Sequence, residues 1–271
     1  KNQNGGRAEG LLVKPLDDGF SCWEALVRPG KRLNAGDSVI IDSETSILIL
    51  DRLDQGMRKV QIIGNDPPYN VIAKKGKVPL PPYVSENDKA LKSYQTVYAR
   101  VDGSVAAPTA GFHFTESLLK RLASAGIELV YITLHVGPGT FRPVKVKNIK
   151  EHAMHREDYH ISSSAADSIN RAKYEGRRII AVGTTVVRCL ESAAVDKDII
   201  SPGKGSTELF IFPGYEFKVI DGLITNFHLP KSTLLMLVSA MAGYDLTMKA
   251  YREAVKERYR FYSFGDAMLI I

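Results

Sequence analysis

Cysteine is scarce in this chain, with only Cys22 and Cys189 among 271 residues. The two lie far apart in sequence and follow no spacing typical of a metal or redox site. The chain also lacks any apolar run close to the roughly 20 residues that a membrane-spanning helix needs, and no charged-then-apolar leader opens it. We therefore expect two reduced core thiols in a cytoplasmic protein that makes no use of a membrane.

Hydrophobic residues make up 44% of the chain and charged residues 24%, which is ample for a globular core and allows two domains. The sequence begins at Lys1 in a polar, glycine-rich stretch without methionine, so we expect that an N-terminal segment is missing. The formal net charge of +6 favours an anionic partner such as nucleic acid, because basic surfaces gain counterion release when they bind phosphates.

The organisation of the chain changes near residue 85. Before it, the chain has short apolar and β-branched runs at residues 10–16, 22–27, 38–41, 46–50 and 59–63. Turn signals such as Asp-Gly and Pro-Gly separate these runs. The proline-rich stretches at residues 67–69 and 78–83 cannot continue a strand ladder, since proline lacks the backbone donor. The sequence predicts a small all-β, barrel-like domain over residues 1–84, with these prolines in the linker.

Residues 85–271 alternate between helical and strand-like patterns. Helices are predicted from Thr115 to about 125 and at 164–175, 184–194, 234–242 and 246–259. Ser232 or Thr233 is expected to cap the helix at 234–242. Strands are predicted at 128–134, 178–182, 207–212, 219–225 and 267–271. This alternation predicts an α/β domain with a mainly parallel sheet. Ligands of such sheets bind beyond the carboxyl ends of strands, which would gather the loops after Leu134, Val182 and Thr225.

All six histidines lie between His113 and His228. Most occupy loops that are punctuated by glycine or proline and rich in hydrogen-bonding residues, where catalytic groups are common. Their confinement to one part of the chain predicts a single site.

Long and unusual strings of residues lie at 94–99, 106–116, 133–137, 139–144, 151–155, 181–188, 225–240, 259–261 and 265–269. These strings resemble the S-adenosylmethionine:tRNA ribosyltransferase-isomerase family of queuosine biosynthesis. The resemblance covers essentially the whole chain, more loosely in its β half.

This resemblance implies transfer and isomerisation of the ribosyl part of S-adenosylmethionine onto the aminomethyl-deazaguanine base at the tRNA wobble position. The product would be epoxyqueuosine-tRNA, with adenine and methionine released. It implies S-adenosylmethionine and that tRNA as partners, no further cofactor and no metal. Two alternatives remain open, a hydrolase of S-adenosylmethionine that needs no tRNA and a noncatalytic RNA-binding module. The sequence leaves the oligomeric state open.

The proposed reaction needs a proton acceptor, because the carbon next to a sulfonium is acidic and its deprotonation could precede the loss of adenine. Histidine suits that task near neutral pH. The three candidates are His113, His135 and His228, each in a distinctive loop. The alternative for each is a neutral structural histidine bonded to the loop backbone.

Other loop residues are candidates for substrate binding. Gly183, Thr184 and Thr185 resemble an anion cradle at a helix start, although a tight turn with a threonine N-cap is equally compatible. Asn226 and Phe227 could bracket a planar base by hydrogen bonding and stacking, unless Phe227 belongs to the core. The remaining candidates share glycine-rich or histidine-containing loops: Thr109, Gly137, Gly139, Thr140, Arg142, His152 and His155.

Two further patterns concern a metal and the tRNA. His152, His155 and His160 invite a metal interpretation, but they lack the spacing and internal glutamate of a zinc helix, so we predict no metal. The predicted C-terminal helix would place a basic stripe on one face, made of Lys249, Arg252, Lys256 and Arg260. We consider it a candidate tRNA surface, with an ordinary solvated helix face as the alternative.

Overall fold

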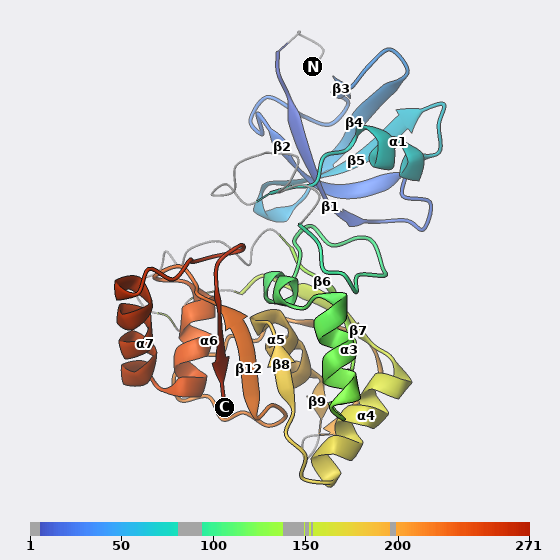
Figure 1. Ribbon diagram of the computed structural model, residues 1–271. Coiled ribbons are helices and arrows are strands. Elements are labelled where there is room, and N and C mark those ends of the chain that lie inside the picture. The colour runs from blue at the N-terminus through green and yellow to red at the C-terminus, as the bar shows by residue number, and fades with distance from the viewer. Residues whose placement is uncertain (1–5, 81–93, 138–148, 150–151, 153, 196–198) are drawn as a thin grey trace. The chain divides into compact units, whose positions relative to one another are not determined.

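The computed structural model describes residues 6–80, 94–137, 149, 152, 154–195 and 199–271 (Figure 1). The chain divides into two compact units. The first holds residues 1–80 and 103–105, and the second holds residues 81–102 and 106–271.

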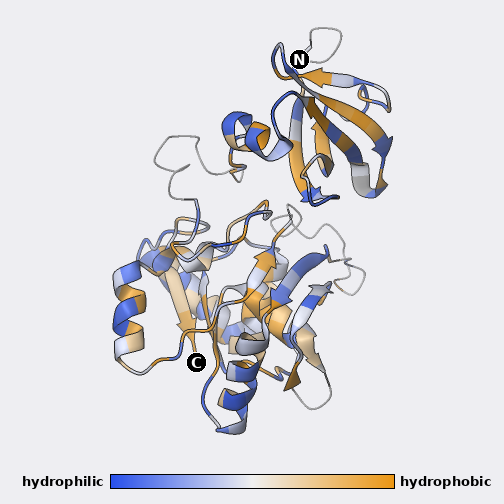
Figure 2. Cartoon of the chain, turned by 90° about the vertical axis from the view of Figure 1, so that its right-hand side faces the viewer, coloured by the Kyte–Doolittle hydropathy of each residue, from blue (hydrophilic) through white to orange (hydrophobic). Residues whose placement is uncertain are grey.

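The first unit contains a five-stranded antiparallel sheet. Its strands are β1 (Glu9–Pro15), β2 (Cys22–Arg28), β3 (Ser38–Ile40), β4 (Thr45–Arg52) and β5 (Met57–Gly64), in the order β1-β2-β5-β4-β3. Strand β2 alternates strictly, so that Trp23, Ala25 and Val27 are buried in the core between their more exposed neighbours. Figure 2 shows hydrophobic residues running along these strands.

The sheet differs from the expected barrel-like domain in two ways. Strands β1 and β3 are its two edges, and no described strand closes it. The unit is also not all β, because helix α1 (Pro68–Lys75) begins inside the proline-rich stretch that we expected to be linker. Proline is well tolerated in the first turn of a helix, where its missing N–H would have no partner.

The second unit combines helices with three small sheets. Strands β6 (Thr133–His135), β7 (Glu157–Ile161) and β11 (Gly203–Thr207) form one sheet in the order β11-β7-β6; β8 (Ile180–Val182), β12 (Gly222–Asn226) and β13 (Ala267–Ile270) form another in the order β13-β12-β8; β9 (Ala194–Val195) pairs with β10 (Ile199–Ile200). The helices of the second unit are α3 (Glu116–Ser124), α4 (Ser163–Tyr174), α5 (Thr184–Ala193), α6 (Thr233–Ala242) and α7 (Tyr244–Lys256). Two short 3-10 helices complete the described elements: η1 (Asp54–Gly56) lies in the first unit and η2 (Thr109–His113) in the second.

The predicted mainly parallel sheet is wrong. Only β8 and β12 pair in parallel, and every other described strand pairing is antiparallel. Two features of the sequence misled the prediction. Strand β7 lies in a stretch for which the sequence predicted no strand, and it pairs with both β6 and β11. A continuous apolar run also shows that a segment is buried, but it does not give the direction of its neighbour.

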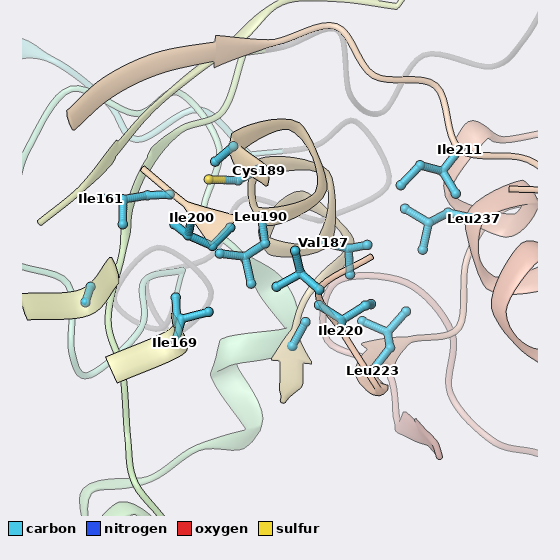
Figure 3. Packing of buried hydrophobic residues seen from close by; sticks show 14 of the residues in the cluster. Ile161, Ile169, Val187, Cys189, Leu190, Ile200, Ile211, Ile220, Leu223 and Leu237 are labelled. Atoms are coloured by element: carbon cyan, nitrogen blue, oxygen red, sulfur yellow. The ribbon is translucent and has the colours of Figure 1, made fainter. Parts of the chain in front are cut away.

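The core of the second unit is formed around α5 and the ends of the small sheets. Figure 3 shows Val187 and Leu190 of α5 packed with Ile220 and Leu223 near strand β12. Helices α6 and α7 lie side by side (Figure 1). Ser232 caps α6, its Oγ accepting from the Leu235 amide at 3.2 Å. Within the described part of the chain, no helix is long and apolar enough to cross a membrane.

Candidate active site

A parallel pair of strands positions the candidate site. Ile180 and Val182 of β8 stand opposite Gly222 and Ile224 of β12, so the carboxyl ends of both strands lie next to each other. Gly183 follows β8 with a φ of +98°, and its amide donates to the Ile224 carbonyl at 2.8 Å. A local parallel pair therefore creates the crevice that ligands use in larger parallel sheets.

A pocket opens at these strand ends. Its lining mixes apolar side chains with hydroxyl, amide and imidazole groups and comes from loops that are distant in sequence: residues 107–110, 136, 182–186, 225–229, 232, 234, 262 and 263. Such a mixture is typical of a site for a small polar molecule with apolar parts. Three loops were expected at the strand ends. The loops after Val182 and Thr225 both line the pocket, and the loop after Leu134 contributes Val136.

His228 is the histidine that lines this pocket. Its Nε2 lies 2.8 Å from the Thr225 hydroxyl, and its amide donates to the Tyr251 hydroxyl at 2.9 Å. Burial lowers the pKa of His228 from 6.5 to about 4, so the imidazole is neutral near pH 7. The ring is held in place and can accept a proton.

Asn226 connects the pocket to a second histidine. Its side chain is buried; Thr109 Oγ1 donates to Asn226 Oδ1 at 3.2 Å, and Asn226 Nδ2 lies 3.0 Å from His113 Nε2. Because the amide nitrogen can only donate, His113 Nε2 accepts, which leaves the ring proton on Nδ1. Burial lowers the pKa of His113, while nearby Asp266 acts in the opposite direction. His113 itself does not line the pocket.

The other sequence-predicted histidines lie elsewhere. His135 stands in β6 opposite Asp158 of β7 and is not among the lining residues. The ring of His152 packs edge-on against Phe210, and the carbonyl of His155 accepts from Arg188 at 3.3 Å. The structure therefore brings together His228 and, through Asn226, His113, but it does not gather the histidines of the described chain into one site.

The start of helix α5 forms one wall of the pocket. Gly183, Thr184 and Thr185 all line it. The N-cap is Gly183, and no side chain caps the helix, so the alternative of a threonine N-cap is wrong. The first amides of a helix have no intrahelical acceptors and favour anionic groups, which suits a carboxylate or hydroxyl ligand next to the two threonines.

Phe227 lines the pocket, but its ring belongs to the core. It is 5% exposed and packs against Phe261 at 5.0 Å, Tyr251 at 5.3 Å and Tyr259 at 5.8 Å between ring centroids. A ring enclosed in this way is not available to stack on a ligand. Of the pair expected to bracket a base, Asn226 keeps a polar role and Phe227 carries packing.

Several lining residues were not among the sequence candidates. Thr225, Ser232, Tyr262 and Ser263 line the pocket although none was predicted to bind substrate. Ser232 was predicted only as a helix cap, and its neighbours gave no reason to assign it more. Conversely, Gly137 is described but does not line the pocket, while Gly139, Thr140 and Arg142 lie outside the described residues.

The basic stripe is only partly formed. Lys249 and Arg252 are exposed on α7. Lys256 ends the helix and pairs with Glu253 and Glu257 at 2.9 and 3.5 Å. Arg260 lies beyond the helix, so it does not continue that helix face.

No group of three histidine, cysteine, aspartate or glutamate residues in the described chain is arranged to hold a metal ion. A metal-free reaction stays a prediction.

A family model and curated relatives agree on one family. A family model described as queuosine biosynthesis protein matches residues 1–270. Proteins named S-adenosylmethionine:tRNA ribosyltransferase-isomerase are 53% identical in Natranaerobius thermophilus and 52% identical in Halothermothrix orenii, each match covering 100% of this chain and 79% of the relative. The sequence of a solved structure, S-adenosylmethionine tRNA ribosyltransferase from Thermotoga maritima, is 36% identical to this chain. The match has a TM-score of 0.49 and covers 100% of this chain and 77% of that one.

Proposed function

Because the chain belongs to the queuosine biosynthesis protein family, we propose that the pocket at the ends of β8 and β12 binds S-adenosylmethionine for the reaction of this family. That reaction is the transfer and isomerisation of a ribosyl group from S-adenosylmethionine to tRNA. The observation that carries the proposal is a neutral, firmly held His228 in a pocket that also contains buried amide and hydroxyl groups.

His228 is proposed as the proton acceptor. The carbon attached to a sulfonium has acidic hydrogens, and a neutral imidazole that faces it can remove one before adenine leaves. Its low pKa keeps it ready to accept a proton throughout the neutral range. Asn226 bonds to both Thr109 and His113, and His113 does not itself line the pocket, so we assign His113 a positioning role.

The polar wall of the pocket is proposed to orient the substrate. Thr184 and Thr185 at the start of α5 suit the carboxylate of the methionine part or the ribose hydroxyls.

The acceptor is proposed to be the aminomethyl-deazaguanine base at the tRNA wobble position. Lys249 and Arg252 remain proposals for phosphate contacts, since both are exposed cations on one helix. A location in the cytoplasm, where the tRNA would be met, is likewise proposed.

The test is adenine release from S-adenosylmethionine with and without tRNA that carries the aminomethyl-deazaguanine base. Ribosyl transfer predicts release only with that tRNA, accompanied by a matching gain in the mass of the tRNA. Equal release without tRNA would instead establish the hydrolase. Binding of tRNA with no release under either condition would indicate the noncatalytic module.

The pH dependence of kcat/KM gives a second test. The free enzyme's base is active when unprotonated, so a pKa of about 4 for His228 predicts a rate that stays level from pH 8 down to about 5. A loss of rate centred near pH 6.5 in the parent would contradict His228 as the base.

The same pKa predicts how folding stability depends on pH. The folded pKa of His228 lies below the unfolded value of 6.5, so protonation favours the unfolded chain. The contribution of this residue is complete above pH 6.5 and is lost as the pH falls toward about 4. Urea denaturation measures the free energy of unfolding of the parent and of His228→Gln as a function of pH. The difference between the two proteins should be constant above pH 6.5, and the parent should lose more stability than the variant as the pH falls below 6.5.

A further inference from the structure

The loop from Arg260 to Asp266 is closed by repeated bonds between its two end residues. The Arg260 amide donates to Asp266 Oδ2 at 2.8 Å, and Arg260 Nη2 donates to Asp266 Oδ1 at 2.6 Å. In the opposite direction, the Asp266 amide donates to the Arg260 carbonyl at 2.8 Å. The ends of the loop are thus held together by both backbone and side-chain bonds.

The interior of the loop is equally constrained. A Cβ at Gly265 would lie 2.5 Å from the Arg260 carbonyl oxygen and 2.5 Å from the Phe261 carbonyl carbon, so only glycine fits there. The ring of Phe261 is anchored against Phe227 and Tyr251. With its ends joined and the partly buried Phe261 packed against Phe227 and Tyr251, the loop presents its next two residues, Tyr262 and Ser263, to the pocket.

Tyr262 adopts a backbone conformation that disfavours a large side chain. Its φ is +71°, in the left-handed region where glycine or asparagine is favoured. The strain is supported by two hydrogen bonds, from the Tyr262 amide to the Phe227 carbonyl and from the Gly265 amide to the Tyr262 carbonyl, both 3.0 Å. The first of these joins the loop to the residue before His228. Backbone strain of this kind collects where a side chain must be placed for function.

We propose that Tyr262 contacts the planar ring of a purine-type base in this pocket, and that the Arg260–Asp266 pair acts as a positioning clamp for it. This inference rests on the proposed function, which supplies two such rings, the adenine of S-adenosylmethionine and the deazaguanine of the tRNA. A tyrosine ring offers a flat apolar face for either. The aromatic ring that we expected from Phe227 is thereby supplied by Tyr262.

The test compares Tyr262→Asn with Tyr262→Phe. Asparagine tolerates the backbone conformation but removes the ring, whereas phenylalanine keeps the ring in the same backbone strain. We expect Tyr262→Asn to raise KM roughly tenfold or more for the substrate that carries the stacked base, and Tyr262→Phe to stay within a few-fold of the parent. A raised KM for S-adenosylmethionine assigns adenine, and a raised KM for tRNA assigns the deazaguanine.

Equilibrium binding separates failure of this inference from failure of the proposed function. Calorimetric titration with S-adenosylmethionine, and separately with the tRNA, needs no turnover. If Tyr262→Asn binds both as tightly as the parent while remaining folded, the Tyr262 contact is overturned even if the parent is fully active. If the parent binds S-adenosylmethionine without transferring a ribosyl group and Tyr262→Asn weakens that binding, the contact stands and the proposed reaction falls.

The clamp is tested with two variants of opposite charge change, Arg260→Gln and Asp266→Asn. If the pair positions the loop, both variants weaken binding at the pocket in the same direction. If Arg260 instead contacts tRNA phosphate, Arg260→Gln weakens tRNA binding and Asp266→Asn strengthens it, while the affinity for S-adenosylmethionine is unchanged; that result would overturn the clamp. Arg121→Gln is the matched control, because it removes the same charge from an exposed position of helix α3 that does not line the pocket, and it should leave the binding of both ligands unchanged.

Discussion

Replacing His228 with glutamine is expected to slow adenine release by about 100- to 10,000-fold, the usual contribution of a general base. Glutamine is similar in reach and can still bond to the Thr225 hydroxyl, which lies 2.8 Å from the imidazole. It cannot accept a proton at neutral pH, so kcat should fall while KM for S-adenosylmethionine changes little. Single-turnover rates with saturating tRNA measure this directly.

His135→Gln is the matched control for this prediction. His135 lies in β6 and does not line the pocket, so its rate should stay within a few-fold of the parent. The rate of His113→Gln should lie between the rates of His135→Gln and His228→Gln, because His113 is connected to the pocket only through its hydrogen bond with Asn226. If His135→Gln were the slow variant and His228→Gln active, the assignment of the base would be wrong.

Replacing Arg188 with methionine is expected to lower the free energy of unfolding by about 3–5 kcal/mol, as removal of one partner from a buried ion pair does. Arg188 Nη1 lies 2.8 Å from Glu157 Oε2, and their side chains are 4% and 2% exposed. Its Nε also donates to the Leu209 carbonyl at 2.9 Å. Methionine would leave the Glu157 charge buried without its cation. Urea denaturation at pH 7 gives the difference.

Two further variants separate the buried charge from lost packing. The double variant Glu157→Leu with Arg188→Met removes both charges and should recover a large part of the stability. Arg171→Met removes the same side chain from an exposed pair with Glu128, where about 0–1 kcal/mol is expected. If the double variant were no more stable than Arg188→Met, the loss would come from packing rather than from an unpaired charge.

The helices of the second unit were predictable because their ends have local signals. Thr115 and Ser232 each cap a helix with a side-chain oxygen, and the predicted spans agree with α3 and α6 within a few residues. The sheets were less predictable, since strand pairing depends on distant partners. Strand β7 illustrates this, because it is defined by its pairing with β6 and β11 and not by a strong apolar pattern.

The loops of the candidate site were also partly predictable. The loops after Val182 and Thr225 do line the pocket, because they follow β8 and β12, which form the one parallel pair among the described strands. Tyr262 could not be identified in the same way, since its positive φ and its bond to the Phe227 carbonyl arise from tertiary contacts. The enclosure of Phe227 by three aromatic rings is equally invisible in the sequence.

The most direct test of the account is a crystal structure of the protein with S-adenosylmethionine bound. We predict density for the ligand at the carboxyl ends of β8 and β12, with its sulfonium next to His228 and the start of α5 around its polar groups. Well-defined ligand density elsewhere on the chain, with this pocket empty, would contradict the central claim.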